Sequence, residues 1–222
     1  MLIEYCEFPD NYFYDVENGI WLGKGNNAEP VRMGITSTLL FLAGGFTKIK
    51  LKTELNNVEF GMAIGTLESS TYFGAIRAPV SGRISKFNPS LKDNLNILNK
   101  SPYDEGWIAE FESINESTLS RLSYGENAKL GLEAKIKELK VRCFKMLPNS
   151  EINGIGLECT GTLRDLEEIF FSNPTGYVVH IVTDDPVAEI ELRRWTNQTK
   201  NEYIEGRREK NLYHFLVRKT SG

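Results

Sequence analysis

Residues 1–117 contain short runs in which apolar and polar side chains alternate, with glycine, proline or asparagine between the runs. Alternation with a period of two is typical of a strand with one buried face, and the turn residues mark where strands end. The expected strands are Lys48–Leu51, Met62–Leu67, Gly74–Arg77, Gly82–Phe87 and Trp107–Phe111. Many short strands at close spacing predict an all-β barrel or sandwich.

Two helices are expected within or directly after this region. A short one is predicted over Ser37–Leu42, with Thr36 or Ser37 as its N-cap. The charged segment Tyr124–Lys140 is rich in good helix formers, which predicts a connecting helix. Its apolar residues recur at near-helical spacing and should dock the helix on a neighbour: Leu130, Leu132, Ile136 and Leu139.

From Val141 onward the pattern changes to strand, helix, strand, helix, strand, strand. The first of these helices is expected to start around Thr162–Asp165, and the second to be capped by Asp185 with Pro186 in its first turn. This order predicts an α+β two-layer βαβαββ sandwich. We therefore expect two domains, residues 1–117 and 149–222, joined by a connecting helix and strand over residues 118–148.

The composition is that of a soluble globular protein, with 41% hydrophobic and 25% charged residues. The net charge of −4 argues against an electrostatic nucleic-acid binder, so we expect no DNA partner and do not expect RNA. No apolar run is long enough to cross a membrane, and the acidic N-terminus does not resemble a signal peptide. Cys6, Cys143 and Cys159 are odd in number and widely spaced, which argues against a disulfide framework and for a cytoplasmic location.

Several ordered motifs lie between residues 8 and 115. They are Asn18-Gly-Ile-Trp-Leu22, Gly34-Ile-Thr36, Gly65-Thr-Leu-Glu-Ser69, Ala78-Pro-Val-Ser-Gly82 and Ser101-Pro-Tyr-Asp-Glu-Gly-Trp-Ile108. In type and spacing they resemble the H protein of the glycine cleavage system, a lipoyl-domain family. The resemblance implies a barrel-sandwich hybrid of the lipoyl, or hammerhead, type.

The chemistry of that family depends on a lysine that carries lipoate as an amide at a hairpin tip. In its E-S-x-K pattern this lysine lies three residues after the glutamate and seven before the alanine of A-P-V-S-G. Counting from Glu68 and from Ala78 leads to the same residue, Thr71, and no lysine occurs between Lys52 and Lys86. A hydroxyl cannot supply the amine of the amide link, so this interpretation expects no modified residue and no cofactor, lipoate included.

Two interpretations of the hairpin at residues 69–74 remain open. In the first, the domain is a packing or docking module and the hairpin is an ordinary turn. In the second, Ser70, Thr71, Tyr72 and Phe73 form a recognition loop for a protein partner, because exposed aromatic residues are typical binding anchors.

A second resemblance covers residues 149–219. The segment Gly156-Leu-Glu-Cys-Thr-Gly-Thr-Leu163 matches the glycine, cysteine and both leucines of G-L-x-C-P-x-P-L, with threonine in place of each proline. Residues 176–186 look like the second strand and the D-D-P helix start of the same family. This family is the TusA/SirA group of small sulfur carriers, whose cysteine holds a persulfide.

Cys159 is the candidate catalytic residue of this half. It is expected just before a helix, where unpaired N–H groups and the positive end of the dipole favour a thiolate. Thr162 is expected to cap that helix by accepting from the Asp165 N–H group, which would hold the thiol in place. Glu158 and Asp165 act against thiolate formation, and an inert cysteine in a domain kept for its shape is the alternative.

We therefore expect a non-lipoylated H-protein-like domain fused to a TusA-like sulfur carrier that relays persulfide sulfur through Cys159. Such a protein is a carrier and at most a sulfurtransferase accessory. Its partners would be a sulfur donor and acceptor, or a lipoyl-related enzyme complex. The alternatives are a scaffold or regulator in which both active positions are vestigial, and a glycine cleavage H-type carrier lipoylated elsewhere.

His180 and His214 lie mid-strand in the last domain and could face the same side. Two histidines without a third ligand do not make a zinc site, so no metal is expected.

Overall fold

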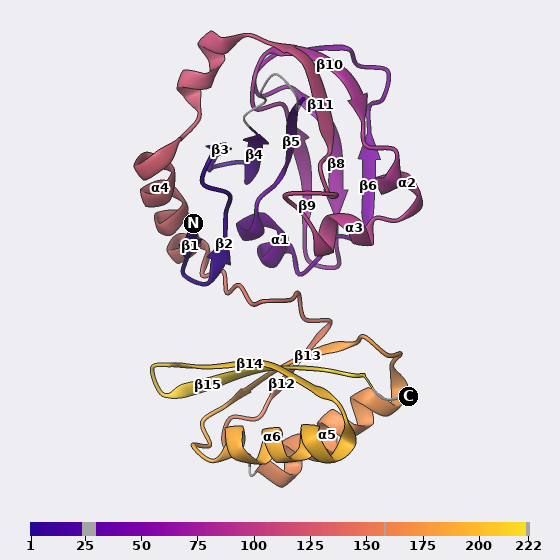
Figure 1. Ribbon diagram of the computed structural model, residues 1–222, viewed down its shortest axis with the longest axis vertical. Coiled ribbons are helices and arrows are strands. Elements are labelled where there is room, and N and C mark those ends of the chain that lie inside the picture. Colours follow the sequence, from indigo (N-terminus) through magenta and orange to yellow (C-terminus); the bar gives the residue numbers. More distant parts are fainter. Residues whose placement is uncertain (24–29, 158, 221–222) are drawn as a thin grey trace. The chain divides into compact units, whose positions relative to one another are not determined.

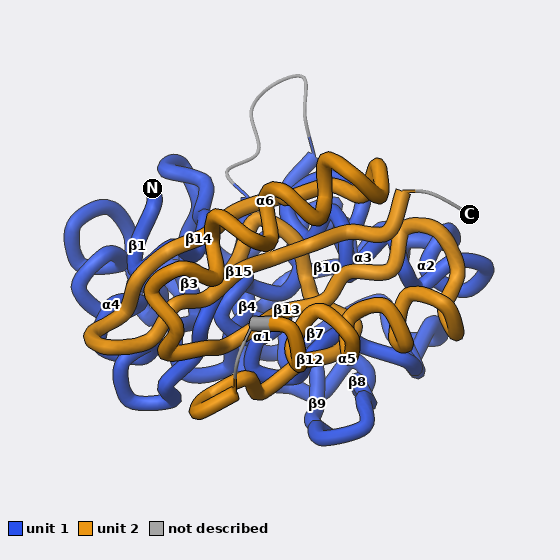
Figure 2. The backbone as a smooth tube through the Cα atoms, turned by 90° about the horizontal axis from the view of Figure 1, so that it is seen from below, with its two compact units in different colours: residues 1–143 blue, residues 144–222 orange. Residues whose placement is uncertain are grey.

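The structure is a computed structural model that describes residues 1–23, 30–157 and 159–220. The chain divides into two compact units, an N-terminal unit of residues Met1–Cys143 and a C-terminal unit of residues Phe144–Gly222 (Figure 2). Among the described residues, no helix is both long and apolar enough to cross a membrane.

The N-terminal unit is built mainly from short antiparallel strands, as its alternating pattern predicts (Figure 1). Six of them form one sheet in the order β3-β4-β5-β11-β10-β7, and three form a second in the order β6-β8-β9. The six strands are β3 (Tyr12–Asp15), β4 (Ile20–Gly23), β5 (Val31–Ile35), β7 (Asn57–Val58), β10 (Gly82–Phe87) and β11 (Ala109–Ile114). The second sheet holds β6 (Lys48–Leu51), β8 (Ala63–Glu68) and β9 (Phe73–Arg77). This arrangement agrees with the expected lipoyl-type barrel-sandwich.

Short helices join the strands of this unit. They are α1 (Ser37–Ala43), α2 (Ser90–Asp93), α3 (Asn96–Lys100) and the 3₁₀ helix η1 (Glu116–Arg121). The first begins where predicted, and Thr36 is its cap because the Thr36 hydroxyl accepts from the Leu39 N–H group at 3.3 Å. It ends at Gly44, whose φ of 65° lies in the left-handed region that glycine adopts without strain.

The family-like motifs form the inner contacts of this unit. The Gly34 Cα faces the Trp21 ring so closely that an added Cβ would lie 2.6 Å from it. The Trp21 indole N–H donates to the Pro102 carbonyl at 3.0 Å, and the Tyr103 hydroxyl accepts from the Ser37 N–H group at 2.8 Å. Gly34, Trp21 and Tyr103 are therefore needed for the packing of this unit, whether or not it carries a cofactor.

Helix α4 (Gly125–Leu139) is the predicted connecting helix, and it packs within the N-terminal unit. Its buried residues are Ala128, Leu132 and Ile136, spaced by four, so Ala128 takes the place expected for Leu130, which is 63% exposed. They contact the N-terminal hairpin of β1 (Leu2–Ile3) and β2 (Cys6–Glu7) in one apolar cluster.

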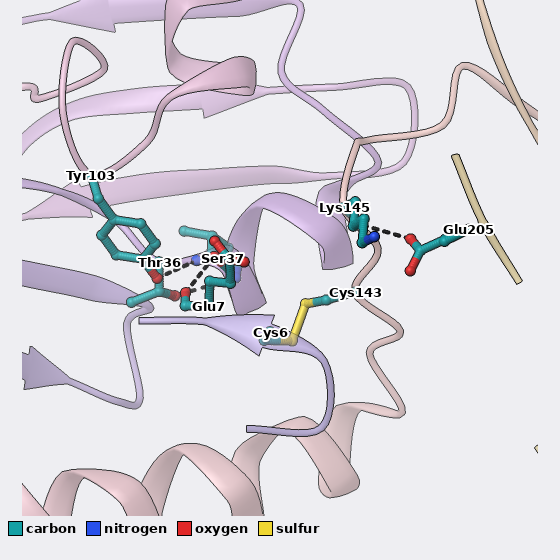
Figure 3. The surroundings of a disulfide bond; sticks show 9 residues. Cys6, Glu7, Thr36, Ser37, Tyr103, Cys143, Lys145 and Glu205 are labelled. Carbon is teal, nitrogen blue, oxygen red and sulfur yellow. Dashed lines mark hydrogen bonds between the residues drawn. A yellow bond between two sulfur atoms is a disulfide. The ribbon is translucent and has the colours of Figure 1, made fainter. Parts of the chain in front are cut away.

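The expectation of no disulfide is wrong. Cys6 and Cys143 are joined by a disulfide, both sulfurs lie in the cluster beneath α4, and 137 residues separate them in the sequence (Figure 3). Spacing along the chain gave no sign of the bond, because the fold alone brings the two ends of the N-terminal unit together.

The C-terminal unit has the predicted order of elements. It comprises β12 (Ser150–Asn153), α5 (Cys159–Ser172), β13 (Val178–Thr183), α6 (Ala188–Thr199), β14 (Glu202–Glu209) and β15 (Leu212–Arg218). The sheet order is β12-β13-β15-β14, in which β12 and β13 are parallel and the other pairs are antiparallel. Both helices cover one face of this sheet and form its apolar core (Figure 1).

The starts of both helices in this unit differ from the expectation. Helix α5 begins at Cys159, three residues before Thr162, and α6 begins at Ala188. The Asp185 carboxylate accepts from the Val187 N–H group at 2.9 Å in the turn before α6, so it orders the approach to the helix rather than capping it.

Candidate functional site

The tip of the β8–β9 hairpin, residues 69–72, is the position at which the family-like motif expects a modified lysine. Thr71 lies in this turn, as predicted, and its side chain is exposed. The turn is closed by the Ser69 N–H group, which donates to the Tyr72 carbonyl at 2.8 Å.

Ser69 organises the turn. Its hydroxyl oxygen accepts from the N–H groups of Thr71 at 3.2 Å and Tyr72 at 3.0 Å. The same hydroxyl donates to the Ala43 carbonyl at 2.7 Å. A serine that bonds to backbone groups two and three residues ahead stabilises a turn locally.

The hairpin tip is also bonded to the end of helix α1. The last carbonyls of a helix have no partner within the helix. The Ala43 carbonyl accepts from the hydroxyl of Ser69 and, at 3.3 Å, from the hydroxyl of Thr71. The side chain that replaces the expected lysine therefore points back to the protein.

Two aromatic residues follow at the tip. The Tyr72 ring packs edge-on against Phe46 at 5.8 Å between centroids, and burial raises the pKa of the Tyr72 hydroxyl. The ring lies over Gly74, where an added Cβ would be 2.1 Å from the Tyr72 hydroxyl, so a larger residue there would displace the Tyr72 ring. Phe73 points outward and is 71% exposed.

Lys48 is the lysine whose register brings it to this end of the sheet. It pairs with Glu68 across β6 and β8, and its Nζ lies 3.1 Å from the Glu68 carboxylate. Its side chain is half exposed. The Lys48 amine therefore lies beside the hairpin, whereas residues 69–72 at the tip contain no lysine.

In the C-terminal unit, Cys159 is the first residue of α5 rather than the residue before it. Its side chain and all of Glu158 lie outside the described residues. Thr162 lies in the first turn of the helix, and its buried hydroxyl has no hydrogen-bond partner among the described residues. The predicted capping bond to the Asp165 N–H group is absent because the helix starts one turn earlier.

The two histidines face the same side of the sheet, as the strand pattern suggested. His180 Nε2 and His214 Nδ1 are 3.0 Å apart, and both rings are buried. The part of the chain that the structure describes contains no group of three or more metal-ligating side chains.

Sequence reasoning placed Ser69 in the hairpin but did not predict its bonds, and it missed Ala43 and Phe46 as parts of the site. A serine at the start of a turn commonly bonds to the backbone N–H groups two or three residues ahead, so the role of Ser69 could have been predicted. The contacts with Ala43 and Phe46 join segments more than 25 residues apart, and no local pattern predicts them.

The comparisons with known proteins concern the N-terminal unit. Residues 12–135 match the family model of the glycine cleavage H-protein. A probable glycine cleavage system H protein of Sulfolobus acidocaldarius is 34% identical over 143 residues, 64% of this chain and 95% of the relative. A glycine cleavage system H protein of Aquifex aeolicus is 31% identical over 144 residues, 63% of this chain and 89% of the relative.

A solved structure also resembles the chain. The crystal structure of a glycine cleavage system H protein from Mycobacterium marinum has a TM-score of 0.46 and 23% identity, and covers 60% of this chain and 100% of that one. The family match ends before the C-terminal unit begins, so it lends no support to the resemblance of residues 149–219 to the TusA/SirA family.

The match overturns the expectation that no cofactor is involved, because H-protein homologues carry lipoate on a swinging arm. That expectation rested on Thr71 and on the absence of a lysine between Lys52 and Lys86, which concern one attachment site in this chain and not the cofactor of the family. With more than half of its 222 residues matched, the chain belongs to the glycine cleavage H-protein family.

Proposed function

We propose that the protein is an H-type carrier that docks on enzymes of the glycine cleavage kind through the hairpin face of its N-terminal unit. The match over residues 12–135 supports this proposal most directly. The hairpin adds a second argument, since it is rigidly bonded to α1 and presents the exposed Phe73.

Docking through the hairpin predicts that Phe73 is a binding anchor. An aromatic side chain that becomes buried in an interface commonly strengthens binding by about tenfold or more. We expect Phe73→Ser to weaken binding to a glycine cleavage enzyme that acts on H proteins by about tenfold, measured by calorimetry. The matched control is Phe171→Ser on α5, because Phe171 is 91% exposed in the other unit. Equal affinity of the Phe73 variant and the unaltered chain would rule out this docking face.

The carrier role also predicts where lipoate is attached. The amide link requires an amine, and Thr71 has none, so the arm needs a lysine at another position. Lys48 beside Glu68 is the residue that we propose. Co-expression with a lipoate ligase should add one lipoyl group, which peptide mapping should place on Lys48.

The controls for this experiment are two variants. Lys48→Arg should remove the modification while keeping the ion pair with Glu68. Thr71→Lys should gain a lipoyl group at the hairpin tip, which shows that the ligase recognises the turn. A full-length protein that stays unmodified while its Thr71→Lys variant is lipoylated would contradict attachment to this chain.

A second candidate function concerns Cys159. The disulfide occupies Cys6 and Cys143, so Cys159 is the cysteine that remains for thiol chemistry, and α5 begins at that residue. Backbone N–H groups at a helix start favour a thiolate. These two placements support sulfur relay, in which a persulfide is held on Cys159 and passed to an acceptor.

The test of sulfur relay is mass spectrometry after incubation with a cysteine desulfurase and cysteine. We expect one added sulfur on Cys159 and none in Cys159→Ser. Alkylation of the unfolded, unreduced chain should modify one cysteine, and three after reduction. If Cys159 takes up no sulfur, the C-terminal unit is a scaffold and not a carrier.

A further inference from the structure

The sheet face of the C-terminal unit that lies opposite α5 and α6 carries a chain of polar side chains from all four strands. His180 on β13 lies between Glu151 on β12 and His214 on β15, with Nδ1 2.9 Å from the Glu151 carboxylate and Nε2 3.0 Å from His214 Nδ1. His214 Nε2 is 3.7 Å from the carboxylate of Glu209 on β14. The two imidazole rings are stacked, with an interplanar angle of 18°.

The chemistry of these groups determines where the hydrogens lie. A carboxylate only accepts, so His180 Nδ1 carries the hydrogen that is donated to Glu151. His180 Nε2 is then the acceptor for the Nδ1 hydrogen of His214. One further proton can be added on His214 Nε2, which faces Glu209, without breaking any of these bonds.

A second proton cannot be added in the same way. It would have to enter at His180 Nε2, which already accepts from His214. Two N–H groups and two positive charges would then face each other across 3.0 Å. In a buried site such a contact is strongly repulsive, so the two rings must separate before both are charged.

We propose that His180 and His214 form a buried pair that binds one proton and excludes a second, so that the C-terminal unit loosens on acidification. The other charged groups that the described contacts place around the pair are Glu151, Glu209 and Arg207. Arg207 Nε lies 2.8 Å from the Glu209 carboxylate, so Glu209 is shared between Arg207 and the histidine pair.

The segment that enters this unit is fastened to the same face. The Phe144 ring packs on His180 at 4.4 Å, and the Arg207 guanidinium lies 4.4 Å above the Phe144 ring. Lys145, which follows Phe144, donates its backbone N–H group to the Glu205 carboxylate at 2.7 Å (Figure 3). Separation of the two imidazole rings would disturb the contact between His180 and Phe144. We therefore expect the sheet and the segment at Phe144 and Lys145 to loosen together.

Proton binding should lower the stability of the C-terminal unit at acid pH. In the unfolded chain each histidine binds a proton near pH 6.5, so the unfolded state binds two protons below that pH. The folded pair binds one. Since the unfolded state binds the additional proton, the ratio of folded to unfolded molecules should fall about tenfold for each pH unit below about 6.5.

The chain has only two histidines, so every histidine signal in a nuclear magnetic resonance spectrum comes from this pair. Below pH 6.5 we expect one imidazolium and one neutral ring in the folded full-length protein. At neutral pH the nitrogen shifts should show a hydrogen on Nδ1 of His180. Two imidazolium rings with independent titrations near pH 6.5 in the folded protein would overturn the proposal.

Hydrogen exchange provides the second measurement. Peptides from β13 and β15 should lose protection between pH 6.5 and 5, after correction for the intrinsic exchange rate, while peptides from the N-terminal unit serve as the internal reference. In His214→Asn, the side-chain amide can keep a bond to His180 but binds no proton. This variant should lose the excess acid sensitivity of β13 and β15, and an unchanged pH dependence would overturn the proposal.

Discussion

The hydroxyls of Ser69, Thr71 and Thr162 lie in two different environments. Those of Ser69 and Thr71 at the hairpin tip both donate to the Ala43 carbonyl. That of Thr162 in α5 is buried with no hydrogen-bond partner among the described residues. A buried hydroxyl without a partner lowers stability, because it has lost its water and gained no bond.

Replacement of Thr162 by valine should therefore not destabilise the protein. The shape is nearly conserved and the unpaired hydroxyl is removed, so we expect an unchanged free energy of unfolding or a gain of about 1 kcal/mol. Urea denaturation followed by fluorescence of Trp195, which lies in the core of the same unit, measures this change. A loss of 1 kcal/mol or more would mean that the hydroxyl forms a bond in the folded state. Thr162→Ala, which also removes a methyl group, shows the separate effect of a cavity.

At the scale of elements, the contact between the β8–β9 hairpin and the end of α1 defines the candidate site. The contact supplies bonds for a helix-end carbonyl that would otherwise depend on water. It also fixes the tip from which Phe73 projects.

Removal of the Ser69 hydroxyl should loosen this contact. Ser69→Ala loses two bonds within the turn and one to Ala43, and we expect it to cost about 1–2 kcal/mol of stability. Ser70→Ala is the matched control, since Ser70 is exposed in the same turn. Denaturant midpoints of the two variants should differ clearly. Equal midpoints would show that the hairpin does not depend on Ser69.

Most elements were predictable because their signals are local. The strands of the hairpin, the Thr36 cap of α1 and the period of α4 are patterns within a few residues. The start of α5 was misplaced because Thr162–Asp165 resembles a capping box inside a longer helix. In α4, Ala128 replaced Leu130 on the buried face because the neighbouring hairpin selects which side of the helix is covered.

The N-terminal unit buries polar aromatic rings in its core. The Tyr103 hydroxyl accepts from the Ser37 N–H group, and the Tyr14 hydroxyl donates to the Pro9 carbonyl at 2.6 Å. Burial raises the pKa of both hydroxyls well above the ordinary value for tyrosine.

This burial predicts unfolding at alkaline pH. Unfolded tyrosines lose their protons near pH 10, whereas Tyr14 and Tyr103 keep theirs in the folded state. The folded state then binds more protons, so the stability present below pH 10 is lost as the pH rises above it. Urea denaturation at pH 8 to 11 should show a fall in the folded-to-unfolded ratio, to which Tyr14 and Tyr103 together contribute up to about 100-fold per pH unit. Tyr14→Phe should make this fall less steep, and an unchanged slope would contradict the assignment.

Local signals in the sequence were enough to predict most of the elements, their order and the family of the N-terminal unit. Periods of two and 3.6, caps and turn residues act over a few positions, and family motifs are read in order along the chain. Three features depend on how distant segments pack: the Cys6–Cys143 disulfide, the bonds from the hairpin to Ala43 and the pairing of His180 with His214. These contacts join residues 26 to 137 positions apart, and such distances close only when sheets and helices pack.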